Sequence, residues 1–143
     1  MEEAGPRKVM VFGTFAVLHP GHLYFFREAK KYGEKLIVVV ARDATVQKIK
    51  GFLPKIDERA RREMVEAIKF VDKAVLGDKK DWYKIILKYK PEVICLGYDQ
   101  AVPKNFPAEL KKRGLDAKIF RLKSYKPKKY KSSLISCDLK PET

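Results

Sequence analysis

One stretch near the start of the chain, residues 13–22, reads Gly-Thr-Phe-Ala-Val-Leu-His-Pro-Gly-His. It separates residues 9–12, an apolar segment of strand length, from residues 23–29, whose apolar spacing is that of a helix packed on a sheet. Gly13 permits a sharp turn, Pro20 suits a first helical turn, and Gly21 leaves the backbone open to a ligand. The stretch therefore predicts a strand-to-helix junction whose unpaired N–H groups and helix dipole form an anion site.

Two histidines, His19 and His22, lie three residues apart on the predicted first helical turn. That spacing places both rings on one helix face, toward the same anion. Imidazoles with a pKa near neutrality donate a hydrogen bond to, or hold a proton on, phosphate oxygens whose charge grows during phosphoryl or nucleotidyl transfer. A zinc pair or a chance surface pair would show the same spacing. The phosphate interpretation is favoured because the chain has only these two histidines, with a glycine between them and a glycine-flanked strand end before them.

Strand-like and helix-like segments alternate along the rest of the chain. Apolar runs predict strands at 35–41, 74–76, 93–96 and 118–122, and helical spacing predicts helices from 20 to about 32, then at 44–49, 57–70, 82–89 and 107–113. We expect an α/β, Rossmann-like fold of three layers, with a five-stranded parallel sheet in the order 3-2-1-4-5 and helices on both faces.

In that strand order the first and fourth strands are neighbours where the winding reverses, which is where a ligand crevice opens. Thr14 and Phe15 would then face residues 97–99 across one nucleotide site. Asp99 would accept a hydrogen bond from the ribose or the base; an ordinary turn residue is the alternative. The carboxyl edge of the sheet is therefore the expected place of the site.

Basic residues follow the second predicted strand. Lys48 and Lys50 fall in residues 48–55, which we interpret as a basic loop able to close over a triphosphate, with a solvated surface loop as the alternative. Asp43 is the expected cap of the short helix before this loop. The two lysines are thus candidate phosphate ligands.

The helix predicted at 57–70 has an apolar stripe at Met64, Val65 and Ile68, which we expect in the core. Arg61 lies off that stripe. A guanidinium can hold two phosphate oxygens at once, so Arg61 is a candidate phosphate ligand, with a surface arginine as the alternative.

The 143 residues fit one domain, which we assign to residues 1–125, followed by a basic tail at 126–143 that could join the site. The longest apolar run, residues 36–41, is far too short to cross a bilayer, and residues 1–8 contain no apolar signal core. Cys95 lies in an apolar run, and Cys137 lies in the tail. These features predict a cytoplasmic protein with no structural disulfide.

The junction also resembles a known signature. Residues 13–15 and 19–22 are similar to the GTFD…HxGH motif of the cytidylyltransferase-like nucleotidyltransferases. The likeness continues at 38–43, 48–51, 61–65, 96–100 and 110–116, where the chain looks most like the archaeal FAD synthetases, which adenylylate FMN. One departure lies in the motif, because the family carries Asp where this chain has Ala16. A carboxylate there could brace the turn that aims the histidines.

The resemblance implies roles for individual residues. The expected catalytic residues are His19, His22, Lys48 and Arg61. The expected ATP contacts also include residues of the junction, the basic loop, the end of the fourth strand and the tail: Thr14, Phe15, Pro20, Gly21, Lys50, Asp99, Tyr125, Ser132 and Ser133. No metal ligand stands out in the sequence, and a divalent ion, with Mg²⁺ expected, would bridge the phosphates.

The expected reaction joins ATP and FMN into FAD and releases pyrophosphate. A cytidylyltransferase acting on a phosphorylated alcohol is one alternative, because the motif alone does not separate the two. A noncatalytic nucleotide- or nucleic-acid-binding domain is the other, suggested by Ala16 and by the net charge of +14, which attracts ATP, a flavin phosphate or nucleic acid alike. We expect ATP and FMN as partners, rather than nucleic acid or a membrane, and the resemblance implies a homodimer.

Overall fold

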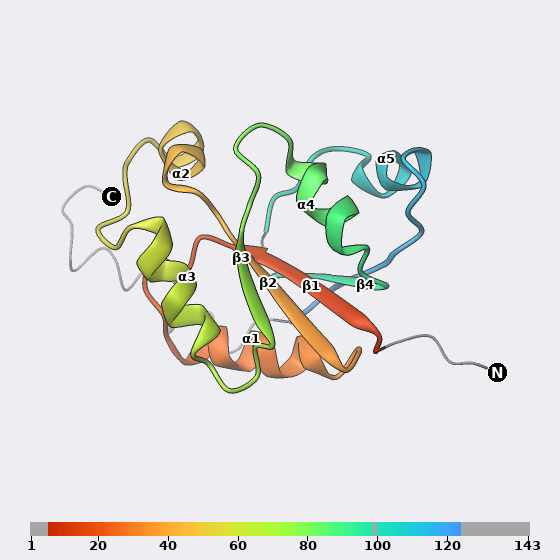
Figure 1. Cartoon of the computed structure of the whole chain (residues 1–143), viewed down its shortest axis with the longest axis horizontal. Helices are drawn as coiled ribbons and strands as arrows, with labels where there is room; N and C mark the ends of the chain where they lie inside the picture. Colours follow the sequence, from red (N-terminus) through yellow and green to blue (C-terminus); the bar gives the residue numbers. More distant parts are fainter. Residues whose placement is uncertain (1–5, 99, 124–143) are drawn as a thin grey trace.

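The computed structural model of the chain describes residues 6–98 and 100–123. Strands and helices alternate in the order β1 (Lys8–Gly13), α1 (Pro20–Lys30), β2 (Lys35–Val40), α2 (Asp43–Lys50), α3 (Glu58–Glu66), β3 (Lys73–Leu76), α4 (Trp82–Tyr89), β4 (Val93–Leu96), α5 (Phe106–Lys112) and β5 (Lys118–Arg121). The strands pair in parallel in the order β3-β2-β1-β4-β5, as the alternation predicted (Figure 1).

Two apolar cores lie on opposite faces of this sheet. Successive side chains of a strand point to opposite faces, so Val9 and Val11 pack with α1 and α3, whereas Met10 and Phe12 pack with α4 and α5. Figure 1 shows these two helix pairs on either side of the strands. Burial on both faces explains why the central strands are continuous apolar runs.

Helix α2 is placed differently from the other helices. It follows β2 at the carboxyl edge of the sheet and stands clear of both helix layers (Figure 1). Val46 is its only buried residue. Side-chain packing alone therefore does little to fix its orientation.

The expectation that Met64 lies in the core is wrong, because its side chain is 45% exposed. Residues four apart share a helix face, and in α3 that inward face carries Arg61 and Val65, which are 1% and 0% exposed. Met64 precedes Val65 by one residue and so points away from the sheet. Arg61 is therefore buried at a position where an apolar stripe would place a hydrophobic residue.

The expected basic loop is also partly wrong, since Lys48 and Lys50 lie in the last turn of α2. The helix continues to Gly51, whose φ of 85° is the left-handed conformation that ends helices. Asp43 is the first residue of α2, after its N-cap Arg42, and its carboxylate contacts α3 instead of capping its own helix. The lysines therefore sit on an ordered element.

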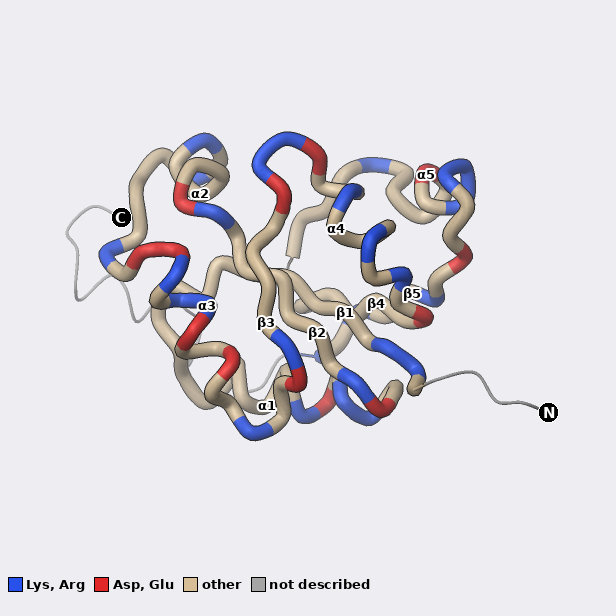
Figure 2. Tube along the Cα trace, viewed as in Figure 1, with Lys and Arg blue, Asp and Glu red and all other residues tan. Residues whose placement is uncertain are grey.

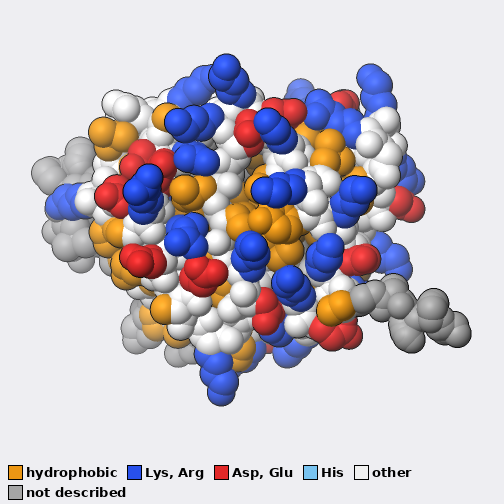
Figure 3. Space-filling model, viewed as in Figure 1, with side chains coloured by type: hydrophobic (Ala, Val, Ile, Leu, Met, Phe, Trp, Pro, Cys, Tyr) orange, Lys and Arg blue, Asp and Glu red, His pale blue; other side chains and the backbone are white. Residues whose placement is uncertain are grey.

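The positive charge is distributed widely. Figure 2 shows Lys and Arg on every helix, with acidic residues interspersed. On the face seen in Figure 3, separate basic side chains surround a hydrophobic area in the middle. That face lacks the continuous basic track with which a nucleic-acid-binding surface follows a phosphate backbone.

The helices of the described part of the chain are short. The longest of them, α1, has 11 residues, whereas a membrane span needs about 20 apolar residues. Within residues 6–98 and 100–123, no helix combines the length and the apolar character that crossing a membrane requires.

Candidate active site

The two histidines cap the helix that follows β1. His19 is the N-cap of α1, and its Nδ1 accepts a hydrogen bond from the backbone N–H of Gly21 at 3.1 Å. The Nδ1 of His22 accepts from the backbone N–H of His19 at 3.3 Å. This is the reciprocal arrangement of a capping box, with imidazoles in the places usually held by a hydroxyl and a carboxylate. The predicted strand-to-helix junction is confirmed, and Pro20 begins the helix. The N–H groups of Gly21 and His22, expected to be unpaired, donate to Nδ1 and to the carbonyl oxygen of His19.

Burial favours the neutral form of both rings. They stack with their centroids 3.9 Å apart, burial lowers the pKa of His19, and burial together with the neighbouring His19 lowers the pKa of His22 to about 3. The sequence-based expectation of a pKa near neutrality therefore fails for His22. A neutral imidazole whose Nδ1 accepts a hydrogen bond carries its proton on Nε2. The His22 ring is thus neutral, with its proton on Nε2.

The ring of Phe15 packs against the ring of His22. Its ring is 7% exposed, meets the His22 ring edge-on at 5.2 Å, and lies beside Phe26. The ring also covers Gly13, where an added Cβ would lie 2.5 Å from its Cζ, so glycine is needed there for close approach. Phe15 was expected to contact ATP; its side chain packs in the core, which leaves its backbone for a ligand.

Gln100 is a residue that sequence reasoning did not assign to the site. Its Nε2 donates to the carbonyl oxygen of Phe12 at 3.1 Å, and its Oε1 accepts from the N–H of Gly97 at 3.0 Å. Arg121 donates to the carbonyl oxygens of Gly97 and Gln100 at 2.7 and 2.9 Å. Gln100 therefore ties the ends of β1 and β4 together where the crevice was predicted. A hint was available, because the chain has very few amide side chains.

Arg61 occupies a different place from the one expected. Its side chain is fully buried and donates to the carbonyl oxygens of Thr14 at 2.8 Å and Ile56 at 2.9 Å, and to the carboxylate of Asp43 at 2.6 Å. All three guanidinium nitrogens are thus engaged with the protein. This arrangement makes Arg61 a brace beneath the junction rather than a side chain extended toward a ligand.

The remaining predicted site residues fall into two groups. Lys48 and Lys50 are exposed on the last turn of α2, and Pro20 and Gly21 form the first turn of α1. Four of the expected ATP contacts lie outside the described residues: Asp99, Tyr125, Ser132 and Ser133. The described part of the site therefore consists of the junction, α2 and the end of β4.

An open cavity of about 220 Å³ lies beside His19, lined by Leu18, His19, Pro20, Leu23 and Ile68. Except for His19 its lining is apolar, which suits an apolar group better than a phosphate. Nowhere in the described part of the chain do three or more His, Cys, Asp or Glu side chains lie together as metal ligands would.

Solved structures share this architecture. A lipopolysaccharide core biosynthesis protein from Thermoplasma volcanium is similar with a TM-score of 0.81 and 39% identity, covering 85% of this chain and 99% of that one. A pantoate-beta-alanine ligase from Francisella tularensis gives a TM-score of 0.57 at 15% identity, covering 84% of this chain and 60% of that one. The second similarity concerns the fold alone.

Sequence comparisons are more specific. The chain is 50% identical over 119 residues to an FAD synthase from Aciduliprofundum boonei, which covers 82% of this chain and 79% of that protein. It is 48% identical over 116 residues to an FAD synthase from Archaeoglobus fulgidus, covering 80% and 82%. The cytidylyltransferase-like family model matches residues 10–137. With its strand order, its histidine-capped helix and this match over most of its length, the chain belongs to the cytidylyltransferase-like family.

Proposed function

We propose that this protein is an FMN adenylyltransferase, an enzyme that makes FAD and pyrophosphate from FMN and ATP. The observation that carries this proposal is the similarity to archaeal FAD synthases at about half identity, over roughly four fifths of both chains. The chemistry of the junction agrees with it, because a helix N-terminus flanked by two imidazole rings suits a phosphate chain. The motif resemblance found in the sequence gives the same assignment.

In this reaction a phosphate oxygen of FMN attacks the α-phosphorus of ATP, and the bond from that phosphorus to the leaving pyrophosphate breaks. The attacking phosphate is already an anion at neutral pH, so the step needs no base to remove a proton. The work of the protein is to orient the two phosphates and to stabilise the charge that develops on them. The Nε2–H of His22, the adjacent His19 ring and the positive end of the α1 dipole would do this with fixed dipoles.

Positive charge would come from Lys48 and Lys50. Both side chains are exposed on the last turn of α2, and an ammonium on a long flexible stem binds phosphate as a point charge. Arg61 would contribute indirectly, since its guanidinium is buried against Thr14 and Asp43. This division of roles differs from the direct phosphate contact expected of Arg61 from the sequence.

The divalent ion belongs to the substrate in this proposal. Within residues 6–98 and 100–123, no group of three or more metal-ligating side chains is present. Mg²⁺ would arrive bound to the ATP phosphates and neutralise part of their charge. The family resemblance further supports a cytoplasmic location and a homodimer. Light scattering on the purified protein would test the homodimer.

The test is an assay of the purified chain with FMN, ATP and Mg²⁺, in which FAD is separated by chromatography and pyrophosphate is measured in parallel. We expect equal amounts of both products, and we expect His22→Ala to remove turnover while the protein stays folded. Product from CTP and a phosphorylated alcohol, without FAD from ATP, would instead indicate a cytidylyltransferase. No turnover with any substrate, together with tight salt-sensitive RNA binding, would indicate a binding domain.

A further inference from the structure

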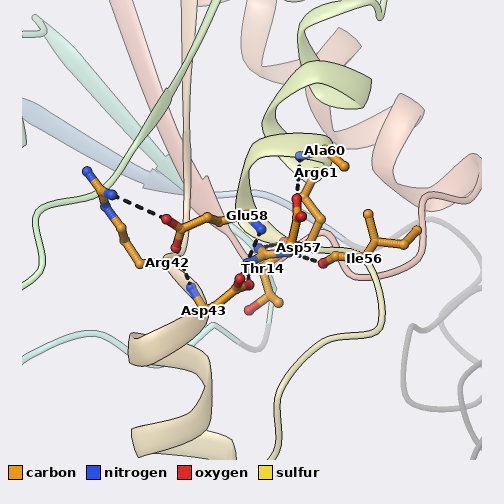
Figure 4. A network of polar contacts seen from close by, with 8 residues as sticks. All are labelled: Thr14, Arg42, Asp43, Ile56, Asp57, Glu58, Ala60 and Arg61. Carbon is orange, nitrogen blue, oxygen red and sulfur yellow. Dashed lines mark hydrogen bonds and ion pairs between the residues drawn. The ribbon is translucent and has the colours of Figure 1, made fainter.

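Four charged side chains meet at the carboxyl edge of the sheet, beneath the junction. They are Arg42, Asp43, Glu58 and Arg61, and we call them the helix clasp (Figure 4). Figure 4 shows them between the start of α2 and the start of α3. Two cations and two anions cancel in charge, so the clasp is not itself an anion site.

The clasp joins the N-termini of two helices to each other. The backbone N–H of Asp43, the first residue of α2, donates to Oε1 of Glu58 at 2.8 Å. In return the N–H of Glu58, the first residue of α3, donates to Oδ2 of Asp43 at 3.2 Å. The N-cap of α2, Arg42, makes no capping bond with its side chain and contacts Glu58 at 3.3 Å instead. Helix α2 therefore depends on a carboxylate from another helix for its first turn.

The two arginines tie this helix pair to the sheet. Arg61 donates 2.6 Å to Oδ1 of Asp43 and 2.8 Å to the carbonyl oxygen of Thr14, the residue that follows β1. Arg42 donates 2.8 Å to the carbonyl oxygen of Gly77, the residue that follows β3. Since α2 itself follows β2, the clasp connects the carboxyl ends of three adjacent strands. It also links α2 directly to the backbone that leads to His19.

Any loosening of the clasp would move the C-terminal end of α2 farther than its start. Val46 is the only buried residue of this helix, so packing does not replace the hydrogen bonds at its start. A helix of this length rises about 10 Å from end to end, and tilting it by about 10° at its base moves the last turn by about 2 Å. Lys48 and Lys50 lie on that last turn. Displacements of about 1 Å in a catalytic group can lower rates by about a hundredfold.

We infer that Asp43, Glu58 and Arg61 are positioning residues that set the distance between the lysines of α2 and the histidines of α1. The inference rests on the proposed function, in which Lys48 and Lys50 stabilise the reacting phosphates. The clasp acts through those lysines and touches neither substrate. Its loss should therefore lower kcat more than it changes the KM for FMN.

The test compares Asp43→Asn and Glu58→Ala with a matched control, Asp57→Ala. Asp57 caps α3 by accepting from Ala60 at 2.9 Å, so its loss weakens the same helix without touching the clasp (Figure 4). We expect kcat to fall about tenfold in each clasp variant, with the KM for FMN within about twofold of wild type. We expect Asp57→Ala to lower the melting temperature and to leave kcat unchanged.

A second comparison identifies the route of the effect. In a background that carries both Lys48→Ala and Lys50→Ala, Asp43→Asn should lower kcat by less than about threefold, because the two lysines that it positions are already gone. Equal fractional losses in both backgrounds would overturn the inference, as would a loss of kcat in Asp57→Ala equal to that in Asp43→Asn. Wild-type kcat in the Lys48→Ala, Lys50→Ala variant alone would instead remove the lysines from the proposed function, and the inference with them. Unchanged kcat in both clasp variants would overturn the inference alone.

Discussion

Replacing His22 by glutamine tests whether the site histidines work as neutral donors. Glutamine is the usual capping-box residue at this helix position, so its side-chain oxygen can still accept from the N–H of His19. The substitution thus keeps the cap and removes one titrating ring. What changes is the dependence of stability on pH.

The size of the change follows from the pKa of His22. Its folded value of about 3 lies below the ordinary value of 6.5, because burial and His19 disfavour the charged ring. As the pH falls, the unfolded chain therefore binds this proton before the folded chain does. Stability is full above pH 6.5 and is lost progressively from there to about pH 3. Between pH 8 and pH 5 the loss is about 2 kcal/mol, or about 6 °C in melting temperature.

The measurement is denaturant unfolding at several pH values between 5 and 8, for the wild type and for His22→Gln. The carboxyls whose pKa is lowered by partners, such as Asp72, begin to titrate only below pH 5, so they do not interfere. The wild type should lose about 2 kcal/mol more than the variant on going from pH 8 to pH 5. Equal losses would show that His22 titrates near its ordinary value, which would refute the neutral-donor interpretation.

Three further outcomes are expected. Gly13→Ala should destabilise the fold by about 1–3 kcal/mol in thermal or denaturant unfolding, because the new methyl meets the Phe15 ring, whereas Gly77→Ala, with its nearest neighbour at 3.4 Å, should be nearly neutral. Gln100→Leu should raise the KM for ATP about tenfold and leave the KM for FMN unchanged, because it releases the end of β4 from β1. Ala16→Asp should raise kcat about tenfold if a carboxylate braces the turn, and an unchanged kcat would show that this chain braces it in another way.

The fold was predictable because its signals are local. The four apolar residues of β4 stand between Pro91 and Gly97, and α4 begins after Asp81 and ends before Lys90, so composition alone marked these boundaries. Alternation of such segments leaves few parallel topologies, and the observed order is the one predicted. The largest boundary error is at α3, which was predicted to extend to residue 70 and ends at Glu66.

The site was less predictable because its key contacts join distant segments. The sequence shows Arg61 as one of several neighbouring arginines, and nothing local distinguishes an exposed one from a buried one. Its burial is favourable only because Asp43, Thr14 and Ile56 converge on it from three other segments. The low pKa of His22 likewise depends on burial, which the spacing of the two histidines does not reveal.

The site separates the groups that hold geometry from those that supply charge. The clasp, in which Arg61 is fully buried and the other three side chains are partly exposed, is balanced, with two cations and two anions. The ring of His22 is neutral, so neither carries net charge into the protein. In the proposed function, attraction for a triphosphate then comes from the N-terminus of α1 and from Lys48 and Lys50, whose exposed side chains carry no cost of burial. Removing Lys48 should therefore weaken a salt-sensitive attraction, whereas disturbing Arg61 should alter geometry with little dependence on salt.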